Sequence, residues 1–453
     1  MTERAKEPLW LSRALSPFTE VRPGEAVTVL LLSANVFLLL SAYYLIKPVR
    51  EALILALESG AEYKAYMSGV IALLLFVLVP LYAKLVDKLP RLRLLVGVNL
   101  AFAVQLLLFM AVMGSSAVEA RLGLIFYAWV GIFNMMIVAQ FWAYANDLYD
   151  KARGERLFPI VALGASVGAA VGSQFSALLI PLFGLPSMLL VSAMLLALCA
   201  LIFVWIERRE QGHAMERTQP PKASIQPGQP GAGAFALVFS HRYLLLVALF
   251  SLVFSWVNTN GEYMLGKLIK ADATAAVASG SIAESAQGEY IGAAYGEFFF
   301  YVNVLGVLLQ SFVVSRVVRW LGLSRAFLIL PVLALGNAAI VAALPVLSVL
   351  RVGKVAENAT DYSLNNTLRQ MLWLVTSTEM KYKAKQAIDT FFVRIGDVFS
   401  AISVWLLAGV IAVPIQRFAW LSVGLALAWL ALGVAIGSAH QHRSRLVVGA
   451  ESG

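Results

Sequence analysis

The chain has 453 residues, of which 60% are hydrophobic and 13% charged, and its formal net charge is +9. Soluble domains carry roughly 45–50% apolar and about 25% charged residues, so this composition excludes an ordinary soluble enzyme, a disordered chain and a disulfide scaffold. Cys199 is the single cysteine, which rules out an intramolecular disulfide.

The apolar residues lie in runs that are long enough to cross a membrane, because a bilayer core requires about 20 apolar residues in a helix. We therefore predict an all-α integral membrane protein surrounded by lipid. The first run is too long for a cleavable signal peptide, and we expect it to be a retained anchor. The twelve predicted spans lie near residues 27–57, 66–86, 94–114, 121–146, 157–180, 186–206, 243–268, 292–315, 324–343, 346–375, 384–411 and 417–437.

The basic residues gather in alternate loops, on the side of the membrane that also holds both ends of the chain. Cytoplasmic loops of membrane proteins carry an excess of Lys and Arg, so we predict that both termini are cytoplasmic. The positive net charge then reflects topology, and we expect no nucleic-acid partner. Short loops with this bias suit a bacterial inner membrane.

The sequence divides into two halves of six spans each. Residues 207–235 are rich in Pro, Gly, Gln and Ser, as in a flexible linker, and separate bundles at 1–206 and 236–453. The turn KLVDKLPRLR after the second span is similar to RVVRWLGLSR after the eighth. Two parallel six-helix repeats resemble the major-facilitator architecture.

A polar cluster interrupts the first span and comprises Tyr43, Tyr44, Lys47, Pro48, Arg50 and Glu51. Ionisable groups in a membrane span normally face a cavity or a partner. Lys47 and Glu51 are spaced i,i+4 and are expected to pair, which would leave Arg50 as an unpaired cation for an anionic substrate. Alternatively, the first helix ends at Lys47 and the cluster lies at the outer surface.

The tenth span carries a second cluster, whose members are Arg351, Lys354, Glu357, Asp361, Asn365 and Arg369. At 100° per residue they fall on one side of the helix, and lipid cannot solvate such a stripe, so we expect it to face a water-filled pathway. A salt-bridge ladder against another helix is the alternative.

The seventh span contains a third cluster, with Asn258, Asn260, Glu262 and Lys267. It corresponds in the second half to the Lys47 cluster of the first. Hydrogen bonding between helices would explain it equally well.

Charged and polar residues also mark the cytoplasmic ends of spans four, five and eleven. We expect them to be solvated or to form ion pairs that break and re-form during transport. These residues are Gln140, Trp142, Asn146, Asp147, Glu155, Arg156, Lys385, Asp389, Arg394 and Asp397. In span five, Gly164, Gly168 and Gly172 form a small-residue face that predicts close helix packing.

Four segments together resemble the ATP/ADP translocase family of plastids and intracellular bacteria. They are FWAYANDLYDKARGERLFPIVALGASVGAAVGS, KYKAKQAIDTFFVRIGD, DYSLNNTLRQML and LIKPVREAL. The resemblance extends over roughly residues 30–430 and implies a major-facilitator-like fold and exchange of nucleotides, typically ATP for ADP. It also implies that basic residues of the first and eleventh spans hold phosphates.

Arg50 matches the first of these basic positions. The sequence departs from the family at the second, where Asp397 follows Ile395-Gly396 in place of lysine. An acid there would repel phosphate unless Arg394 compensates.

The leading hypothesis is a carrier that exchanges nucleotides or related anionic solutes by alternating access. Cations would bind the anion, aromatic rings would stack on a base, amides would hydrogen-bond it, and acids would balance or couple the charge. The predicted substrate-binding residues are Tyr43, Tyr44, Lys47, Arg50, Trp142, Asn146, Asn258, Asn260, Arg351, Lys354 and Asn365. The predicted charge-balancing or coupling residues are Glu51, Asp147, Glu262, Glu357, Asp361, Asp389, Arg394 and Asp397.

Two alternatives remain open at this point. One is a proton-coupled carrier of another organic solute, in which Glu262, Asp361 or Asp397 carries the proton. The other is a membrane scaffold without transport. The sequence contains no P-loop, GxSxG, HExxH or GxGxxG motif, so we expect no enzyme activity, no cofactor and no metal site.

Overall fold

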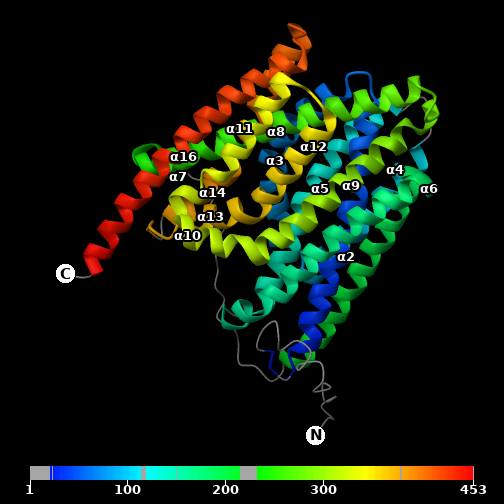
Figure 1. Ribbon diagram of the computed structural model, residues 1–453. Coiled ribbons are helices and arrows are strands. Elements are labelled where there is room, and N and C mark those ends of the chain that lie inside the picture. The colour runs from blue at the N-terminus through cyan, green and yellow to red at the C-terminus, as the bar shows by residue number, and fades with distance from the viewer. Residues whose placement is uncertain are drawn as a thin grey trace. The chain divides into compact units, whose positions relative to one another are not determined.

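The computed structural model is helical throughout the residues that it describes, which are 21–22, 24–113, 119–149, 151–214, 232–377 and 380–451 (Figure 1). In the first part of the chain the helices are α2 (Ala26–Leu55), α3 (Gly60–Lys88), α4 (Arg91–Val112), α5 (Glu119–Leu148) and α6 (Lys151–Ala214). In the second part they are α7 (Ala232–Ser240), α8 (Arg242–Ala278), η1 (Glu284–Ala286), α9 (Gln287–Leu308), η2 (Leu309–Val313), α10 (Val314–Ala326), α11 (Ile329–Ala343), α12 (Leu347–Thr360), η3 (Asp361–Asn365), α13 (Asn366–Met371), η4 (Met380–Ala384), α14 (Lys385–Ala387), η5 (Ile388–Phe392), α15 (Val393–Val404), η6 (Trp405–Val410) and α16 (Ile415–Glu451).

Each of the twelve predicted spans overlaps one or more of these helices. Within the described residues, nine helical segments are long and apolar enough to cross a membrane. One of them, Arg156–Glu210, contains two predicted spans, which are separated by a kink at Gly184 where φ is 74°. The segment Ile329–Ala343 is a shorter apolar helix, and α12 with α13 carries the polar residues of the tenth span. The all-helical membrane fold is confirmed.

Contacts divide the chain into two compact units. Unit 1 contains Met1–Leu53, Val77–Pro221 and Gly288–Phe300, and unit 2 contains Ile54–Phe76, Lys222–Gln287 and Tyr301–Gly453. These units differ from a simple division at the linker, because residues 54–76 group with unit 2 and residues 288–300 with unit 1. Most of the predicted linker 207–235 lies outside the described residues.

Close packing of small residues explains both exchanged segments. A Cβ on Gly69 of α3 would lie 3.0 Å from the Ala401 side chain of α15, within unit 2. A Cβ on Gly296 of α9 would lie 2.7 Å from the backbone nitrogen of Ala177 in α6, within unit 1. In both places the helices approach closely, and at Gly296 any larger residue would force the backbones apart.

In unit 1, α2 lies against the first half of α6 (Figure 1). A Cβ on Gly172 would lie 2.5 Å from the carbonyl oxygen of Ser41, and Cβ atoms on Gly164 and Gly168 would overlap the α2 backbone or its side chains. The predicted packing role of these three glycines is therefore confirmed.

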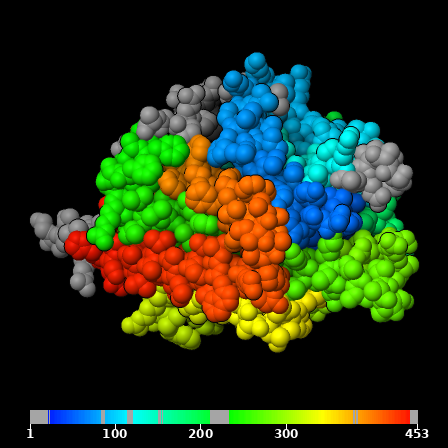
Figure 2. Space-filling view, turned by 90° about the horizontal axis from the view of Figure 1, so that it is seen from above, coloured from blue at the N-terminus to red at the C-terminus, as the bar shows by residue number. Residues whose placement is uncertain are grey.

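In unit 2, the long helix α16 packs against α8 and α11 (Figure 2). Trp429 of α16 is buried beside Phe250 of α8, with ring centroids 5.3 Å apart, and Phe250 stacks on Phe327 at 4.4 Å. These rings belong to the apolar core that holds α8 in place, and α8 carries the polar residues of the candidate site.

Candidate functional site

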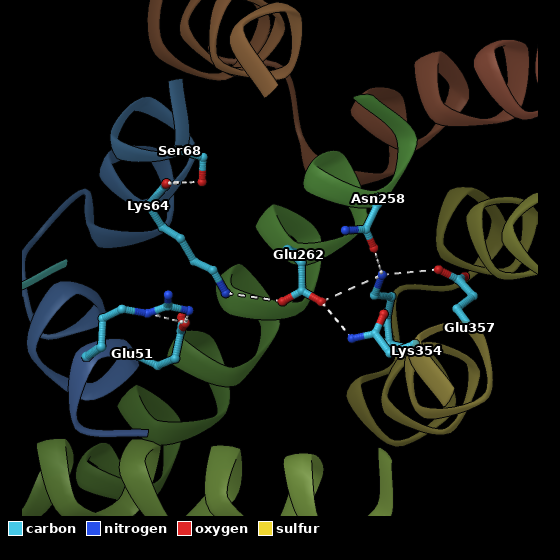
Figure 3. A network of polar contacts seen from close by, with 9 residues as sticks. Glu51, Lys64, Ser68, Asn258, Glu262, Lys354 and Glu357 are labelled. Atoms are coloured by element: carbon cyan, nitrogen blue, oxygen red, sulfur yellow. Dashed lines mark hydrogen bonds and ion pairs between the residues drawn. The ribbon is translucent and has the colours of Figure 1, made fainter. Parts of the chain in front are cut away.

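Lys354 is the most deeply buried charge among the described residues of unit 2. The side chain projects from α12 and is 0% exposed. Its Nζ lies 3.1 Å from Glu357 Oε2 and 3.7 Å from Glu262 Oε1, and it donates a hydrogen bond to Asn258 Oδ1 at 3.2 Å (Figure 3). A Cβ on Gly261 would lie only 3.1 Å from this Nζ, so the glycine in α8 leaves the space that the ammonium occupies.

Glu262 connects Lys354 to a second lysine. Its Oε2 lies 3.4 Å from Lys64 Nζ (Figure 3). Its Oε1 accepts a hydrogen bond from Asn358 at 3.1 Å. Glu262 is 21% exposed, whereas Lys64 is 4% exposed. Glu262 is therefore the most accessible of these charges. Its distances to the two lysines, 3.4 and 3.7 Å, are longer than the 3.1 Å between Lys354 and Glu357.

The four charged side chains of this network, two lysines and two glutamates, have no net formal charge. Glu357 also accepts a hydrogen bond of 2.7 Å from Asn337 in α11. Buried charges are tolerated in a low-dielectric interior when they are paired and hydrogen-bonded, which is the case here. We refer to Lys64, Glu262, Lys354 and Glu357 as the lysine–glutamate network.

Sequence reasoning missed one member of the network, Lys64, and the two amides that donate to its glutamates, Asn337 and Asn358. The second span was predicted to begin near residue 66, which leaves Lys64 just outside it. The helix α3 instead begins at Gly60, so Lys64 lies inside the helical segment. An acid and a base at Glu62 and Lys64 at the start of an apolar run were the available signal.

The polar stripe of the tenth span is helical but not regular. Residues Asp361–Asn365 form a π-helix, so the 100° spacing assumed for an α-helix does not hold across them. Asn365 donates a hydrogen bond of 2.7 Å to Asp361, and Arg369 forms an ion pair of 2.6 Å with Asp389. Arg351 is half-buried one turn before Lys354.

In unit 1, Lys47 lies among aromatic rings. It is 8% exposed, and its Nζ is 3.8 Å from the ring centroid of Phe299, 5.2 Å from that of Tyr44 and 5.7 Å from that of Tyr43. A cation above an aromatic face is attracted by the ring quadrupole. Phe299, which belongs to α9, was not among the predicted site residues.

Arg50 is not an unpaired cation, and that expectation is wrong. It forms an ion pair with the neighbouring Glu51 and donates a hydrogen bond of 3.1 Å from Nε to the same carboxylate. Its guanidinium also lies 4.5 Å from the ring centroid of Tyr127. The long arginine side chain can fold back onto an adjacent residue, which the i,i+4 rule did not consider.

The alternative in which the first helix ends at Lys47 is also wrong, because α2 continues through Pro48 to Leu55. Lys47 and Arg50 therefore belong to a helix that is long and apolar enough to cross a membrane.

The aromatic and amide residues at the end of α5 are far from Arg50. Trp142 follows Tyr127 by fifteen residues, which places it about 22 Å further along the helix at 1.5 Å per residue. Trp142 packs against Phe158 with ring centroids 5.7 Å apart, Asn146 is exposed, and Asp147 forms an ion pair with Arg91 at 3.5 Å. The structure therefore does not bring Trp142 together with the Arg50 group, as the hypothesis of a shared base-binding site required.

Asp397 is held by neighbouring side chains within unit 2. One carboxylate oxygen accepts hydrogen bonds from Ser255 at 2.7 Å and Thr259 at 2.8 Å, and the other is 3.0 Å from Arg394. The predicted compensation of Asp397 by Arg394 is thus a direct ion pair. Beside it, Asn260 accepts a hydrogen bond of 2.7 Å from Ser400.

An all-helical membrane fold with paired charges inside its spans is typical of transport proteins. The sequence model of the Major Facilitator Superfamily matches residues 32–377. This match covers more than half of the chain, which therefore belongs to the Major Facilitator Superfamily and is a membrane transporter.

Comparison with individual proteins gives the same fold at low identity. A solved structure of a bacterial homologue of the iron transporter ferroportin has a TM-score of 0.63, with 13% identity, and the match covers 91% of this chain and 99% of that one. The nucleoside transporter NupG has a TM-score of 0.57, with 14% identity and coverage of 92% and 98%. A peptide transporter of the POT family has a TM-score of 0.58, with 12% identity and coverage of 92% and 97%.

Among curated proteins, ADP,ATP carrier protein 1 of Chlamydia pneumoniae is 22% identical over 302 residues. The match covers 58% of this chain and 56% of the carrier. The chain thus aligns with little more than half the length of this relative.

Proposed function

We propose that this transporter moves an anionic organic solute of the nucleotide class across the membrane by alternating access. The observation that carries the proposal is the complete burial of Lys354 in a network of polar residues. Ionisable residues inside membrane spans generally mark substrate or ion pathways. The similarity to a protein named as an ADP,ATP carrier supports the choice of nucleotides.

The lysine–glutamate network suggests how an anion would bind. A phosphate or carboxylate of the substrate would compete with Glu262, which has the longest contacts to both lysines and is the most exposed member. The ring-lined Lys47 and the Arg50–Glu51 pair of unit 1 offer a second group of cations and aromatic faces. Flat rings there are suited to contact with a nucleobase.

The charge balance of the network bears on whether the carrier is an exchanger. Obligatory exchange would follow if the empty carrier could not reorient because only substrate neutralised its cations. In the structure, Glu357 and Glu262 already neutralise Lys354, so charge alone does not require exchange. Exchange of one nucleotide for another is therefore a separate question for experiment.

Transport in proteoliposomes tests the proposal. Vesicles containing the full chain are loaded with ADP, and the uptake of labelled ATP is compared with that of labelled adenosine, which lacks phosphate. We expect uptake of ATP that Lys354→Gln abolishes, since glutamine keeps a polar side chain but removes the charge. Lys267→Gln is the matched control, because Lys267 lies on α8, is 39% exposed and pairs with Glu62 outside the network.

Folding of the variants is checked by size-exclusion chromatography and thermal unfolding. Equal ATP uptake by the wild type and Lys354→Gln would contradict the assigned role of this lysine. Uptake of adenosine but not ATP would contradict an anionic substrate altogether.

A proton-coupled carrier of another solute is the second candidate. It is favoured by the position of Glu262, whose carboxylate lies 3.4 Å from one lysine and 3.7 Å from another. Protonation of this carboxylate would remove its charge and so weaken both ion pairs. In that case an imposed pH gradient would drive uptake, nucleotide inside the vesicles would not stimulate it, and Glu262→Gln would remove the pH dependence. The absence of flux for every solute tested would instead favour a scaffold.

We also propose that both termini are cytoplasmic and that the protein resides in a bacterial inner membrane, as the distribution of basic residues indicates. Labelling of single cysteines introduced into the loops would test this topology.

A further inference from the structure

A compact group of side-chain oxygens lies where α8 contacts α15, separate from the lysine–glutamate network. It consists of the Asp397 carboxylate, the hydroxyls of Ser255, Thr259 and Ser400, and the amide oxygen of Asn260. Every one of these residues is less than 10% exposed. We refer to these five residues as the oxygen cluster.

Glycine allows the two helices to come close enough to form this cluster. A Cβ on Gly396 would lie 2.8 Å from the Ser255 Cβ and would overlap the carbonyl oxygen of Leu252. Short side chains can therefore reach across the contact. Ser255 and Asn260 are five residues apart on α8, or about 7.5 Å along its axis, with Thr259 between them, and Asp397 and Ser400 are three residues apart on α15, or about 4.5 Å.

The ligand types select a particular class of ion. Carboxylate, hydroxyl and amide oxygens are hard ligands and bind hard cations. The cluster contains one carboxylate, and one oxygen of that carboxylate is already paired with Arg394 at 3.0 Å. Within the described part of the chain, no group of three or more His, Cys, Asp and Glu side chains could hold a metal ion. A divalent or transition metal is thus disfavoured, and a monovalent cation fits.

The Asn260 amide carries a buried polar atom beside the cluster that lacks a partner among the described residues. Its oxygen accepts from Ser400, but its Nδ2 has no hydrogen-bond partner within the described residues although the residue is 0% exposed. A buried unsatisfied N–H is costly. A water molecule bound to a cation in the cluster would provide the acceptor that this nitrogen needs.

We propose that the oxygen cluster is a binding site for Na⁺, formed by Asp397 Oδ1, the three hydroxyl oxygens and the Asn260 amide oxygen. The hydroxyl hydrogens that now point to Asp397 and Asn260 would turn to backbone carbonyls one turn earlier, as Ser and Thr hydroxyls commonly do in helices. Their lone pairs would then face the ion. Arg394 remains on the opposite carboxylate oxygen and keeps the charge of the empty site balanced.

Thermal unfolding of the purified full chain in NaCl, KCl or choline chloride, at equal ionic strength and fixed pH, tests this site without any transported solute. A ligand that binds the folded state raises the apparent stability. We expect a saturable rise of the unfolding temperature in Na⁺ that K⁺ and choline do not produce, and matching saturable binding of radioactive sodium.

The variants Thr259→Val and Asp397→Asn should lose both effects. Ser403→Ala is the matched control, because Ser403 is a hydroxyl on the same helix that donates to Phe399 instead of the cluster. If Asp397→Asn does not fold, Thr259→Val, which preserves shape and charge, decides alone.

Identical unfolding temperatures in the three salts would overturn the proposal, as would sodium binding that survives in Thr259→Val. A dependence on pH without dependence on Na⁺, lost in Asp397→Asn, would also overturn it and assign a proton to this position. None of these results depends on nucleotide transport, so the sodium site and the proposed substrate can fail separately.

Discussion

The coupling between Lys354 and Glu357 is a quantitative prediction of the buried network. Their charged atoms lie 3.1 Å apart, with side chains that are 0% and 9% exposed. Removing one member of a buried ion pair costs about 3–5 kcal/mol, because the other charge stays buried without its partner. Glu357 would keep the 2.7 Å hydrogen bond from Asn337, so we expect Lys354→Met to lie near the lower limit.

The double variant Lys354→Met/Glu357→Gln removes both charges and should recover part of this loss. Groups in direct contact show interaction energies of about 0.5–3 kcal/mol, and the burial of this pair favours the upper part of that range, near about 2 kcal/mol. The measurement is the free energy of unfolding in mixed detergent micelles for the wild type, both single variants and the double variant.

Lys267 and Glu62 provide the comparison pair. They are 2.7 Å apart but 39% and 16% exposed, so water screens their attraction. A cycle of Lys267→Met and Glu62→Gln should yield a coupling of about 1 kcal/mol or less. If the free-energy changes of the two single variants at Lys354 and Glu357 sum to that of the double variant within about 0.5 kcal/mol, the interpretation of the network as a coupled unit is refuted.

Two further predictions concern unit 1. Gly168→Val should greatly reduce the yield of folded protein, because the valine side chain would overlap the Phe37 backbone. Gly97→Ala is the control and should be tolerated, since a Cβ at Gly97 has no atom within 4 Å. Equal recovery of the two variants in size-exclusion chromatography would contradict this packing. Burial raises the pKa of Glu25. Hydrogen bonds from the Arg156 and Arg153 side chains and from the Arg22 backbone outweigh this effect and hold the pKa below the usual 4.5. The ionised carboxylate therefore stabilises the fold above about pH 4.5, and this contribution is lost as the pH falls through the lowered pKa. Thermal unfolding of wild type and Glu25→Gln should show a difference near neutral pH that disappears in acid, and a difference independent of pH would contradict the assignment.

The sequence by itself determined the class of fold and the location of the spans. Hydropathy is a local property, so runs such as 94–114 and 121–146 could be located without knowledge of their neighbours. The glycine spacing in span five likewise predicted a packing face, because residues four apart lie on the same side of a helix. Both features depend on helical periodicity and on the cost of exposing polar backbone to lipid.

The tertiary structure decided which charges meet. Lys64 and Glu262 are 198 residues apart in sequence and are joined by a contact of 3.4 Å. Local spacing could not reveal this pair, and at Arg50 it wrongly suggested a cation without a partner. The π-helix at Asp361–Asn365 changed the register of the tenth span in a similar way.

The contact units of the chain are likewise a property of the tertiary structure. The linker composition suggested a boundary near residues 207–235, but the contact units exchange residues 54–76 and 288–300. Composition reports where a chain is flexible, whereas a unit is defined by side chains that pack together over long separations. At Asp397 the sequence alone indicated an acid that would repel phosphate, and only the folded chain placed Ser255, Thr259 and Arg394 around its two oxygens.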